Sequence, residues 1–402
     1  MKKQKLIIVG LGMAAVRLLD ELVRKQAQQQ YDILVFGEEQ HGGYNRILLS
    51  HVLSGEQTLD DIISHDAPWF EAQGIDWFAG RKVVGIDTQL KQIVDAQGES
   101  YNYAKLVIAT GSLPVMMDVA GNDLSSVLSF RDVFDVQKML SLNPDAGQVV
   151  VVGAGLLGLE AAYGLIKQGF SVTVVHRSDR VMSQQLDQTA GALLQVHLER
   201  LGIGFVLSSQ VLSIMGADSV ESVQLSTGEV LAAQAVVMAI GIRPNVLLAK
   251  QAGLTLKRGI VINKYCQTSV EGIYAVGECS EFDGQTYGLV APIYRQVSVL
   301  VTELMGEVGV AFCNEETPTQ LKVSGVTLYA FGSPLGDEDT QSLVYEDATV
   351  GVYRKVMLSA DNRITGAVLL GNIAQAQQIF SRYQQATPVS ITARSGLVFG
   401  QV

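Results

Sequence analysis

The chain has 402 residues, of which 48% are hydrophobic and 17% charged, and its formal net charge is −11. Because domains usually have roughly 100 to 200 residues, this length predicts two or three domains with sizeable cores. The acidic balance argues against a nucleic-acid or anionic-membrane partner, since both require a basic surface.

The N-terminus passes from lysines directly into an apolar run, without the apolar stretch and cleavage site of a signal peptide. The longest apolar stretch, residues 149–166, is interrupted by three glycines and Glu160, which favours a strand, turn and helix over a membrane span. The few cysteines have no spacing typical of a metal knuckle or redox loop, and no histidine pair has ligand spacing, so we predict no metal. We expect a cytoplasmic protein.

A βαβ unit opens the chain, with a strand over 5–10, a helix over about 13–28 and a second strand over 31–39. Short strands joined by a crossover helix predict a parallel sheet. The same order of elements begins again near Gln148, which indicates duplication of a nucleotide-binding unit.

The first unit carries a glycine turn between its strand and its helix, G-x-G-x-x-A, formed by Gly10, Gly12 and Ala15. Such a turn lets the backbone approach a pyrophosphate at the positive helix N-terminus. Glu38 ends the second strand, where a carboxylate can accept hydrogen bonds from an adenosine ribose, and the neighbouring Glu39 is the alternative.

The second unit has the full G-x-G-x-x-G motif, formed by Gly153, Gly155 and Gly158. Its second strand ends in His176 and Arg177 where the first unit has an acid. An arginine there can bind a ribose 2′-phosphate, which slightly favours NADPH over NADH. Arg177 and Arg180 are equally compatible with solvated surface positions.

Two buried strands end in similar breaks, and both breaks are candidate crossing points for an inserted domain. The first break contains Ala109, Thr110 and Gly111, and the second contains Gly241. Short alternating strands begin near residue 317, over 321–331, 350–358 and 363–370, and a helix pattern follows over 374–385. The predicted domains are a first domain in two parts, an inserted second domain and a C-terminal α+β domain, with boundaries at 1–112 and 244–316, 113–243, and 317–402.

Two glycine motifs in one chain imply two dinucleotides, for which the natural pair is a flavin and an exchangeable nicotinamide. The breaks ATGSLP and AIGIRPN, the motif G-x-G-x-x-G-L-E and the stretch IYAVGE resemble the two-dinucleotide flavoprotein superfamily, which includes disulfide, ferredoxin and rubredoxin reductases. The resemblance implies an α/β fold with two Rossmann-like domains, for FAD and for NADH or NADPH, the second inserted into the first.

The segment YNRILLSHVLSGE, the ending AVGECSE and the run YGLVAP are most similar to the flavin module of assimilatory NAD(P)H-nitrite reductases. In those enzymes an iron-sulfur segment and a siroheme domain follow the flavin module, and this chain stops before either. The resemblance therefore implies a free-standing electron-transfer component. Its acceptor would be rubredoxin, an iron-sulfur protein or a nitrite or nitrate reductase subunit.

Carried over by position, the resemblance assigns Gly10, Gly12 and Glu38 to the adenylate half of FAD, and Arg46 to its phosphates or flavin edge. Glu278 would hold a ribitol hydroxyl. Glu160 would orient the nicotinamide carboxamide, and a solvent-facing or helix-capping Glu160 is the alternative. His51 stands where ferredoxin-reductase relatives usually have a lysine, and as a catalytic residue it would donate to the flavin or carry charge beside it. A histidine packed beside FAD without a catalytic role is equally compatible with the sequence.

The cysteines of disulfide reductases and NADH oxidases are missing from the matching segment, residues 40–47. Cys279 follows Glu278 and is expected to be a small packed residue. The main hypothesis is thus an FAD-dependent NAD(P)H reductase of a protein acceptor. The alternatives are an oxidase or flavin reductase that uses oxygen or quinones, and a non-catalytic FAD-binding regulatory protein. A homodimer is compatible with each.

Overall fold

The computed structural model describes residues 3–333, 335–336 and 340–399. The chain divides into two compact units, each built from separate stretches. Unit 1 comprises 1–49, 57–113 and 242–315, and unit 2 comprises 50–56, 114–241 and 316–402. The chain therefore leaves unit 1 and returns to it, as an inserted domain requires. The detailed domain boundaries stay a prediction.

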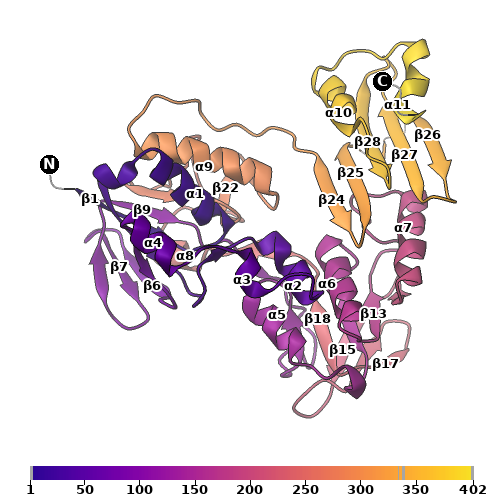
Figure 1. The fold of residues 1–402 in the computed structure, drawn as a ribbon, viewed down its shortest axis with the longest axis horizontal. Helices are drawn as coiled ribbons and strands as arrows, with labels where there is room; N and C mark the ends of the chain where they lie inside the picture. Colours follow the sequence, from indigo (N-terminus) through magenta and orange to yellow (C-terminus); the bar gives the residue numbers. More distant parts are fainter. Residues whose placement is uncertain (1–2, 334, 337–339, 400–402) are drawn as a thin grey trace. The chain divides into compact units, whose positions relative to one another are not determined.

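Unit 1 is built on a five-stranded parallel sheet with the order β21-β9-β1-β2-β5 (Figure 1). Its strands are β21 (Ile273–Ala275), β9 (Lys105–Ile108), β1 (Gln4–Val9), β2 (Tyr31–Phe36) and β5 (Asp76–Phe78). The last four residues of β1 are buried, as expected for a parallel strand covered on both faces. The main helices of unit 1 are α1 (Met13–Arg24), α4 (Ala67–Gln73), α8 (Leu247–Gln251) and α9 (Val290–Leu304).

Helix α1 is shorter than its predicted range. It ends at Arg24, and a separate 3-10 turn follows at Ala27–Gln29. Gln26 between them has φ of 56°, in the left-handed region, which interrupts the helix. Helices α1 and α9 are joined through Glu21, which accepts hydrogen bonds from Arg17 at 2.7 Å and from Ser298 at 3.0 Å.

Short elements complete this part of the chain. An antiparallel sheet contains β6 (Val83–Asp87), β7 (Gln92–Asp95) and β8 (Ser100–Asn102). A second small sheet contains β20 (Ile260–Val261), β22 (Ser280–Phe282) and β23 (Gln285–Thr286). Two pairs of strands are formed by β3 (Gly43–Tyr44) with β4 (Ile63–His65), and by β10 (Ser112–Pro114) with β19 (Ile242–Pro244). Helix α3 (Leu59–Ile62) belongs to unit 1, whereas α2 (Leu49–Leu53) lies almost entirely in the stretch 50–56 of unit 2.

The first part of unit 2 repeats the parallel architecture, with the sheet order β11-β18-β12-β13-β14 (Figure 1). Its strands are β11 (Val127–Ser129), β18 (Ala235–Met238), β12 (Val149–Val152), β13 (Val172–Val175) and β14 (Ile203–Val206). Its other elements are α5 (Val133–Leu140), α6 (Leu156–Lys167), α7 (Gln188–Arg200) and the antiparallel β15 (Val211–Met215), β16 (Ser222–Leu225) and β17 (Val230–Ala232). The apolar stretch 149–166 is thus a strand, a glycine turn and a helix, as predicted.

The C-terminal part of unit 2 is an antiparallel sheet with the order β24-β25-β28-β27-β26. Its elements are β24 (Thr319–Val323), β25 (Val326–Gly332), β26 (Gln341–Asp347), β27 (Val352–Leu358), β28 (Ile364–Leu370), α10 (Ala376–Gln384) and α11 (Arg394–Phe399). Tyr329, Val356 and Leu369 of the sheet share a core with Ile379 of α10 and Leu397 of α11. The sequence analysis did not predict β26 or α11.

These observations confirm the predicted α/β fold with two Rossmann-like domains and a small α+β domain. No helix in the described part of the chain is long and apolar enough to cross a membrane.

Candidate functional site

The parallel sheet of unit 1 brings the carboxyl ends of its strands to one edge, where ligands of open α/β sheets bind. Gly10 follows β1, Glu38 follows β2, Ala109 follows β9 and Glu278 follows β21. Residues more than 250 positions apart in the sequence therefore share this edge, which we call the first edge.

The glycines of the first edge have two different functions. A Cβ atom on Gly10 would lie 2.4 Å from the carbonyl oxygen of Ala109, and Gly10 has φ of +101°, so the turn itself requires glycine. At Gly12 a Cβ would meet only the Arg46 Nε atom, at 3.9 Å. Helix α1 begins after Gly12 without a side-chain cap, which leaves its first N–H groups available to an anion. The open space at Gly12 and the uncapped N–H groups that begin α1 fit a bound pyrophosphate.

The two acids after β2 differ in their contacts. The Glu38 side chain is 62% exposed, and its carboxylate forms an ion pair with Lys82 at 2.6 Å. Glu39 accepts hydrogen bonds from Tyr44 at 2.7 Å and from Arg46 at 2.5 Å. Both Glu39 oxygens accept hydrogen bonds, whereas Lys82 bonds to one oxygen of the more exposed Glu38, so Glu38 has the more accessible carboxylate at this edge. The contact with Arg46 also holds that guanidinium beside the glycine turn.

The break after β9 is tied to the strand that returns from unit 2. Thr110 donates its hydroxyl to the Asn245 carbonyl at 2.8 Å, and the Asn245 N–H donates to the Gly111 carbonyl at 2.9 Å. On the neighbouring strand, Glu278 accepts a hydrogen bond from Ser112 at 2.8 Å. These bonds fix a carboxylate at the end of the edge opposite Glu38.

The sheet of unit 2 forms a second edge of the same design. Gly153 follows β12, His176 and Arg177 follow β13, and Gly241 lies beyond β18. A Cβ on Gly153 would lie 2.4 Å from the carbonyl oxygen of Ala239, whereas a Cβ on Gly155 would meet nothing within 4 Å. The open space again lies at the middle glycine, Gly155. Helix α6 begins directly after it without a side-chain cap.

His176 lies against the second glycine turn. Its Nδ1 atom accepts a hydrogen bond from the Ala154 N–H at 3.3 Å, so the ring proton resides on Nε2, which is buried without a partner. Burial and the charge of Arg177 lower the pKa of His176, which keeps the ring neutral at pH 7. A ring N–H without an acceptor fits an oxygen of a bound ligand.

The two arginines of this corner are not equivalent. Arg180 donates to the backbone carbonyls of Leu186 and Ser183, at 2.9 and 3.3 Å, and pairs with Asp179 at 2.9 Å. Arg177 is exposed, and the structure gives it no such bond within the described residues. Of the two, Arg177 has the guanidinium that is available to a ligand.

Glu160 lies on α6, two residues after the third glycine of the motif. Burial of its carboxyl group raises its pKa from 4.5 to about 7. A carboxyl group with this pKa gains or loses its proton within the physiological pH range, whereas an ordinary surface glutamate stays charged there. Glu160 is intermediate in exposure, and its part in orienting the nicotinamide stays a prediction.

His51 lies on α2 with 45% of its side chain exposed, and its Nε2 atom is 3.8 Å from a Glu56 carboxylate oxygen. Its part in flavin chemistry stays a prediction. Cys279 is fully buried, its thiol donates to the Val276 carbonyl at 3.3 Å, and burial raises its pKa. It is a packed residue, as expected, and not an accessible thiol.

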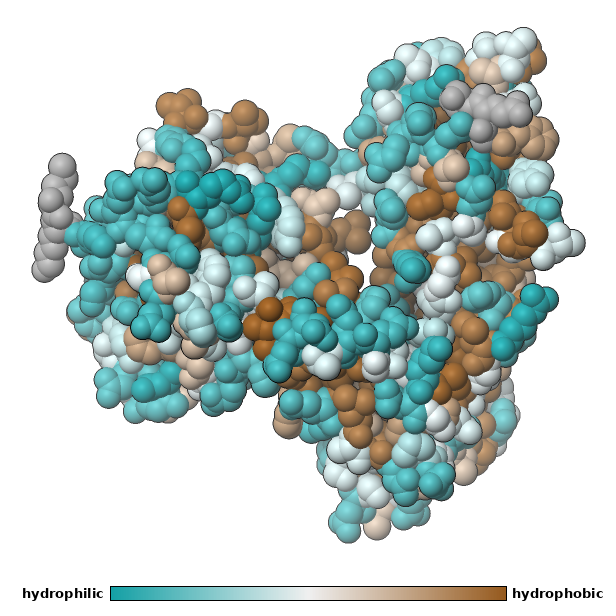
Figure 2. Space-filling model, viewed as in Figure 1, coloured by the Kyte–Doolittle hydropathy of each residue, from teal (hydrophilic) through white to brown (hydrophobic). Residues whose placement is uncertain are grey.

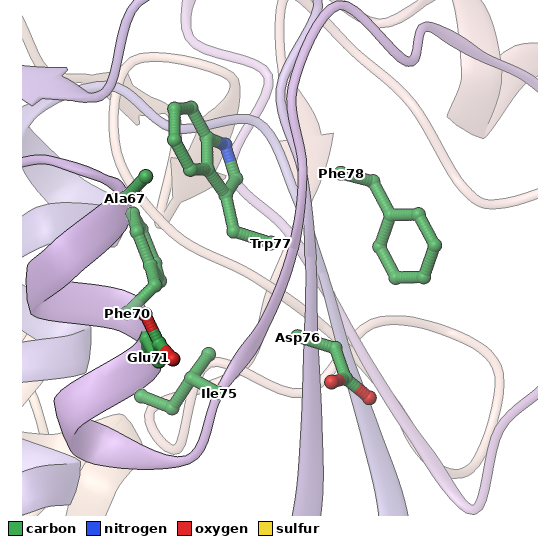
Figure 3. A pocket seen from close by; sticks show the side chains of 7 residues that line it. All are labelled: Ala67, Phe70, Glu71, Ile75, Asp76, Trp77 and Phe78. Carbon is green, nitrogen blue, oxygen red and sulfur yellow. The ribbon is translucent and has the colours of Figure 1, made fainter.

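A hollow of about 430 Å³ lies beside α4 and β5 (Figure 3). It is lined by Ala67, Phe70, Glu71, Ile75, Asp76, Trp77 and Phe78. Figure 3 shows Trp77 and Ile75 on the helix side of the strand, and Asp76 and Phe78 on the other side. None of the predicted ligand-binding side chains contributes to it.

The structure adds three polar side chains that the sequence analysis did not name as site residues. They are Tyr44, which holds Glu39, Lys82, which pairs with Glu38, and Ser112, which donates to Glu278. Tyr44 stands two residues before Arg46, so its proximity had a local signal. Lys82 and Ser112 reach their partners only through the fold.

Comparison with known proteins gives the same architecture. Residues 4–311 match the family described as pyridine nucleotide-disulphide oxidoreductase, and residues 318–386 match the rubredoxin NAD+ reductase C-terminal domain. The solved structure of NADH:rubredoxin oxidoreductase from Clostridium acetobutylicum superimposes with a TM-score of 0.82 at 24% identity, over 97% of this chain and 98% of that one.

Two curated relatives come from Bacillus subtilis (strain 168). A nitrite reductase [NAD(P)H] is 39% identical over 99% of this chain and 49% of its own length. An assimilatory nitrate reductase electron transfer subunit is 39% identical over 98% of this chain and 51% of its own length. The chain thus spans about half the length of these relatives. With its match over residues 4–311, the chain belongs to the pyridine nucleotide-disulphide oxidoreductase family and is an oxidoreductase.

Proposed function

We propose that the first edge binds FAD, the second edge binds NAD(P)H, and the chain passes electrons from the nicotinamide to a protein acceptor. The observation that carries the proposal is the pair of matching edges, each with one glycine that the turn requires and a second that faces open space. Family membership supports both cofactors, since the family is defined by its pyridine nucleotide chemistry.

At the first edge, the N–H groups that begin α1 would hold the FAD pyrophosphate, with Arg46 beside them as a counter-charge. Glu38 would accept from the adenosine ribose, and Glu278 would accept from a ribitol hydroxyl. Ala109, Thr110 and Gly111 would form the backbone wall between them. Ala15 lies under the turn and is fully buried, so it packs the helix on the sheet and does not contact the ligand.

At the second edge, the N–H groups that begin α6 would hold the pyrophosphate of the coenzyme above Gly155. Gly153 and Gly158 allow the turn and the helix to approach, and Gly241 forms the wall after β18. The buried Glu160 carboxyl would accept from the nicotinamide carboxamide, which fixes the ring.

A bound flavin accepts hydride from a nicotinamide and can release electrons singly. The chain offers no pair of accessible thiols for a disulfide relay, because the segment 40–47 lacks cysteine, Cys266 and Cys279 are buried, and the exposed Cys313 is a single thiol. Electrons would therefore leave for another molecule. The names of the relatives support a nitrite or nitrate reductase component, rubredoxin or another iron-sulfur protein.

The second edge favours NADPH. The exposed Arg177 and the buried N–H of His176 lie at the end of β13, where an adenosine ribose is expected, and His176 takes the position of an acid. A cation and a neutral donor suit a 2′-phosphate, whereas NAD-binding sites place a carboxylate there for the 2′-hydroxyl. We propose that Arg177 binds this phosphate.

Anaerobic stopped-flow spectra of the FAD-loaded protein, mixed separately with NADPH and NADH, test the proposal. Rapid bleaching of the visible flavin band by NADPH is expected, followed by reoxidation when rubredoxin or a nitrite reductase component is added. Bleaching with reoxidation only by oxygen or quinones would favour an oxidase or flavin reductase. If neither coenzyme bleaches the flavin, the electron-transfer function is wrong and a regulatory FAD-binding protein is favoured.

A further inference from the structure

Arg354 on β27 carries a buried charge with an incomplete set of partners. The residue is only 3% exposed. Its Nη2 atom donates to the Ala374 carbonyl at 2.8 Å and to the Asn372 side-chain oxygen at 3.2 Å. Its Nη1 atom is buried and has no hydrogen-bond partner within the described residues. Because arginine stays charged in proteins, this position holds a positive charge that only neutral acceptors contact.

The carboxylates around β27 are committed elsewhere. Lys355, the next residue of the strand, projects to the other face of the sheet and pairs with Asp187 at 2.9 Å. On the face of Arg354, the neighbouring strand β26 ends in Asp347, whose Oδ1 atom already accepts from the N–H and the hydroxyl of Thr349, at 3.1 and 2.5 Å. A buried charge without a counter-ion is costly, so the site favours an anion from solution.

The loop that holds the guanidinium leads directly into α10, a helix of nine residues (Figure 1). The helix begins without a side-chain cap. The N–H groups of Gln377 and Gln378 in its first turn have no acceptor within the described residues. Such groups form the positive end of the helix dipole, so they and the guanidinium of Arg354 attract the same kind of ligand.

We propose that the guanidinium of Arg354 and the first N–H groups of α10 bind a small, singly charged oxyanion such as nitrate or formate. One cation balances one negative charge, whereas a doubly charged phosphate would leave charge unbalanced in a buried site. The free N–H bonds of Nη1 and those of the helix are separate donors, which suit an anion with several oxygen atoms better than a halide.

A dissolved anion can reach this site. Asn372 and Ala374, which contact the guanidinium, are both exposed. Figure 2 shows mainly hydrophilic side chains on the visible surface of the C-terminal part of unit 2 near α10. The site belongs to the C-terminal sheet and its helix, so the inference does not depend on the proposed cofactor sites.

The N372D variant tests the site with little change of shape. The Asn372 side-chain oxygen accepts from Arg354 at 3.2 Å and from the Ala374 N–H at 2.9 Å, so an aspartate can keep both contacts and supply the missing negative charge. N372D should raise the dissociation constant of nitrate at least about tenfold, because a carboxylate beside the guanidinium repels a second anion. In nitrate-free buffer its midpoint of thermal unfolding should be about 3 °C higher than that of the wild type, because the charge is then paired.

The matched control is N362D. The Asn362 side chain accepts from Arg394, a partly exposed arginine of the same part of unit 2, so N362D makes the same change of charge at another contact between asparagine and arginine. It should leave nitrate binding unchanged. R354M removes the cation and keeps a side chain of similar length, so it should abolish binding at this site while the protein stays folded.

Equilibrium dialysis of the purified full chain against nitrate at constant ionic strength measures binding. Nitrate held elsewhere is common to all variants, so the difference between the wild type and R354M should be a single nitrate per chain. Formate should displace this nitrate more effectively than phosphate at pH 8, where phosphate is mainly doubly charged. Unchanged binding in N372D and R354M, an equal loss in N362D, or stronger displacement by phosphate than by formate would each overturn the inference.

Discussion

The two sheet edges place the same steric constraint on their glycine turns, but the side chains around the turns carry different charges. At the first edge Gly10 is opposed by the Ala109 carbonyl, and at the second Gly153 is opposed by the Ala239 carbonyl, each 2.4 Å from a Cβ placed on the glycine. The acids of the first edge are paired with Lys82 and Arg46, whereas the second edge presents an arginine and a neutral histidine. Backbone sterics thus determine the turn, and the residues after the second strand determine the ligand that it suits.

The two glycine turns differ in the space available at the third position of their motifs. A Cβ on Gly158 would lie 2.0 Å from the Gly153 carbonyl oxygen, whereas the first edge accommodates the methyl group of Ala15, fully buried. Helix α6 therefore approaches its turn more closely than a side chain would allow.

The largest expected effect follows from this difference. G158A should destabilise unit 2 by about 3 kcal/mol, because a backbone carbonyl cannot move away from the new methyl group without moving the turn. Coenzyme binding should be lost with it. Urea unfolding and coenzyme titration measure both effects.

The matched change at the first edge is A15G, which removes a methyl group in place of adding one. It should cost only about 1 kcal/mol, the usual penalty of glycine in a helix. A loss of stability in G158A no larger than that in A15G would contradict the closer approach of helix α6 to its turn.

Glu160 gives the next effect and has no counterpart at the first edge. Its native pKa of about 7 lies above the unfolded value of 4.5, so its contribution to stability is full below pH 4.5 and is lost as pH rises through 7. Above pH 7 the wild type holds a buried charge that E160Q lacks. E160Q should then be more stable by up to about 3 kcal/mol.

Urea unfolding of the two proteins at several pH values measures this difference. The advantage of E160Q should grow between pH 5 and pH 8, and coenzyme affinity should fall in the same variant if the carboxylate binds the carboxamide. A constant difference in stability across pH would contradict the raised pKa.

The sequence predicted what depends on local pattern. The strands, the glycine turns and the residues that follow β1, β2, β12 and β13 are set by short-range periodicity and by the steric need for glycine. The sequence did not predict that Arg180 bonds to backbone carbonyls or that Glu38 pairs with Lys82. Both contacts depend on the conformation of loops, which leaves no periodic pattern in the sequence. Strand β26 escaped prediction because its acids and serine weaken the apolar alternation.

Arg177 should give a moderate effect, confined to one coenzyme. R177A should lower kcat/KM for NADPH about tenfold, equivalent to about 1.4 kcal/mol, and change it little for NADH, because only NADPH carries the 2′-phosphate. The control is R180A. Since Arg180 bonds to protein carbonyls, its loss should weaken folding and affect both coenzymes alike. Equal effects of R177A on both coenzymes would contradict the proposed contact.

The smallest effect is expected at the ion pair of the first edge. Lys82 and Glu38 have side chains 55% and 62% exposed, and such pairs contribute at most about 1 kcal/mol. K82M should therefore leave the free energy of unfolding nearly unchanged, and FAD affinity of the apoprotein, measured by flavin fluorescence, should change less than about threefold because Glu38 stays available to the ribose. R81M is the comparison, since the partner of Arg81 is the fully buried Asp95 carboxylate, and its loss should cost clearly more. A large loss of FAD affinity in K82M alone would assign the ligand contact to Lys82 and leave Glu38 as its counter-ion.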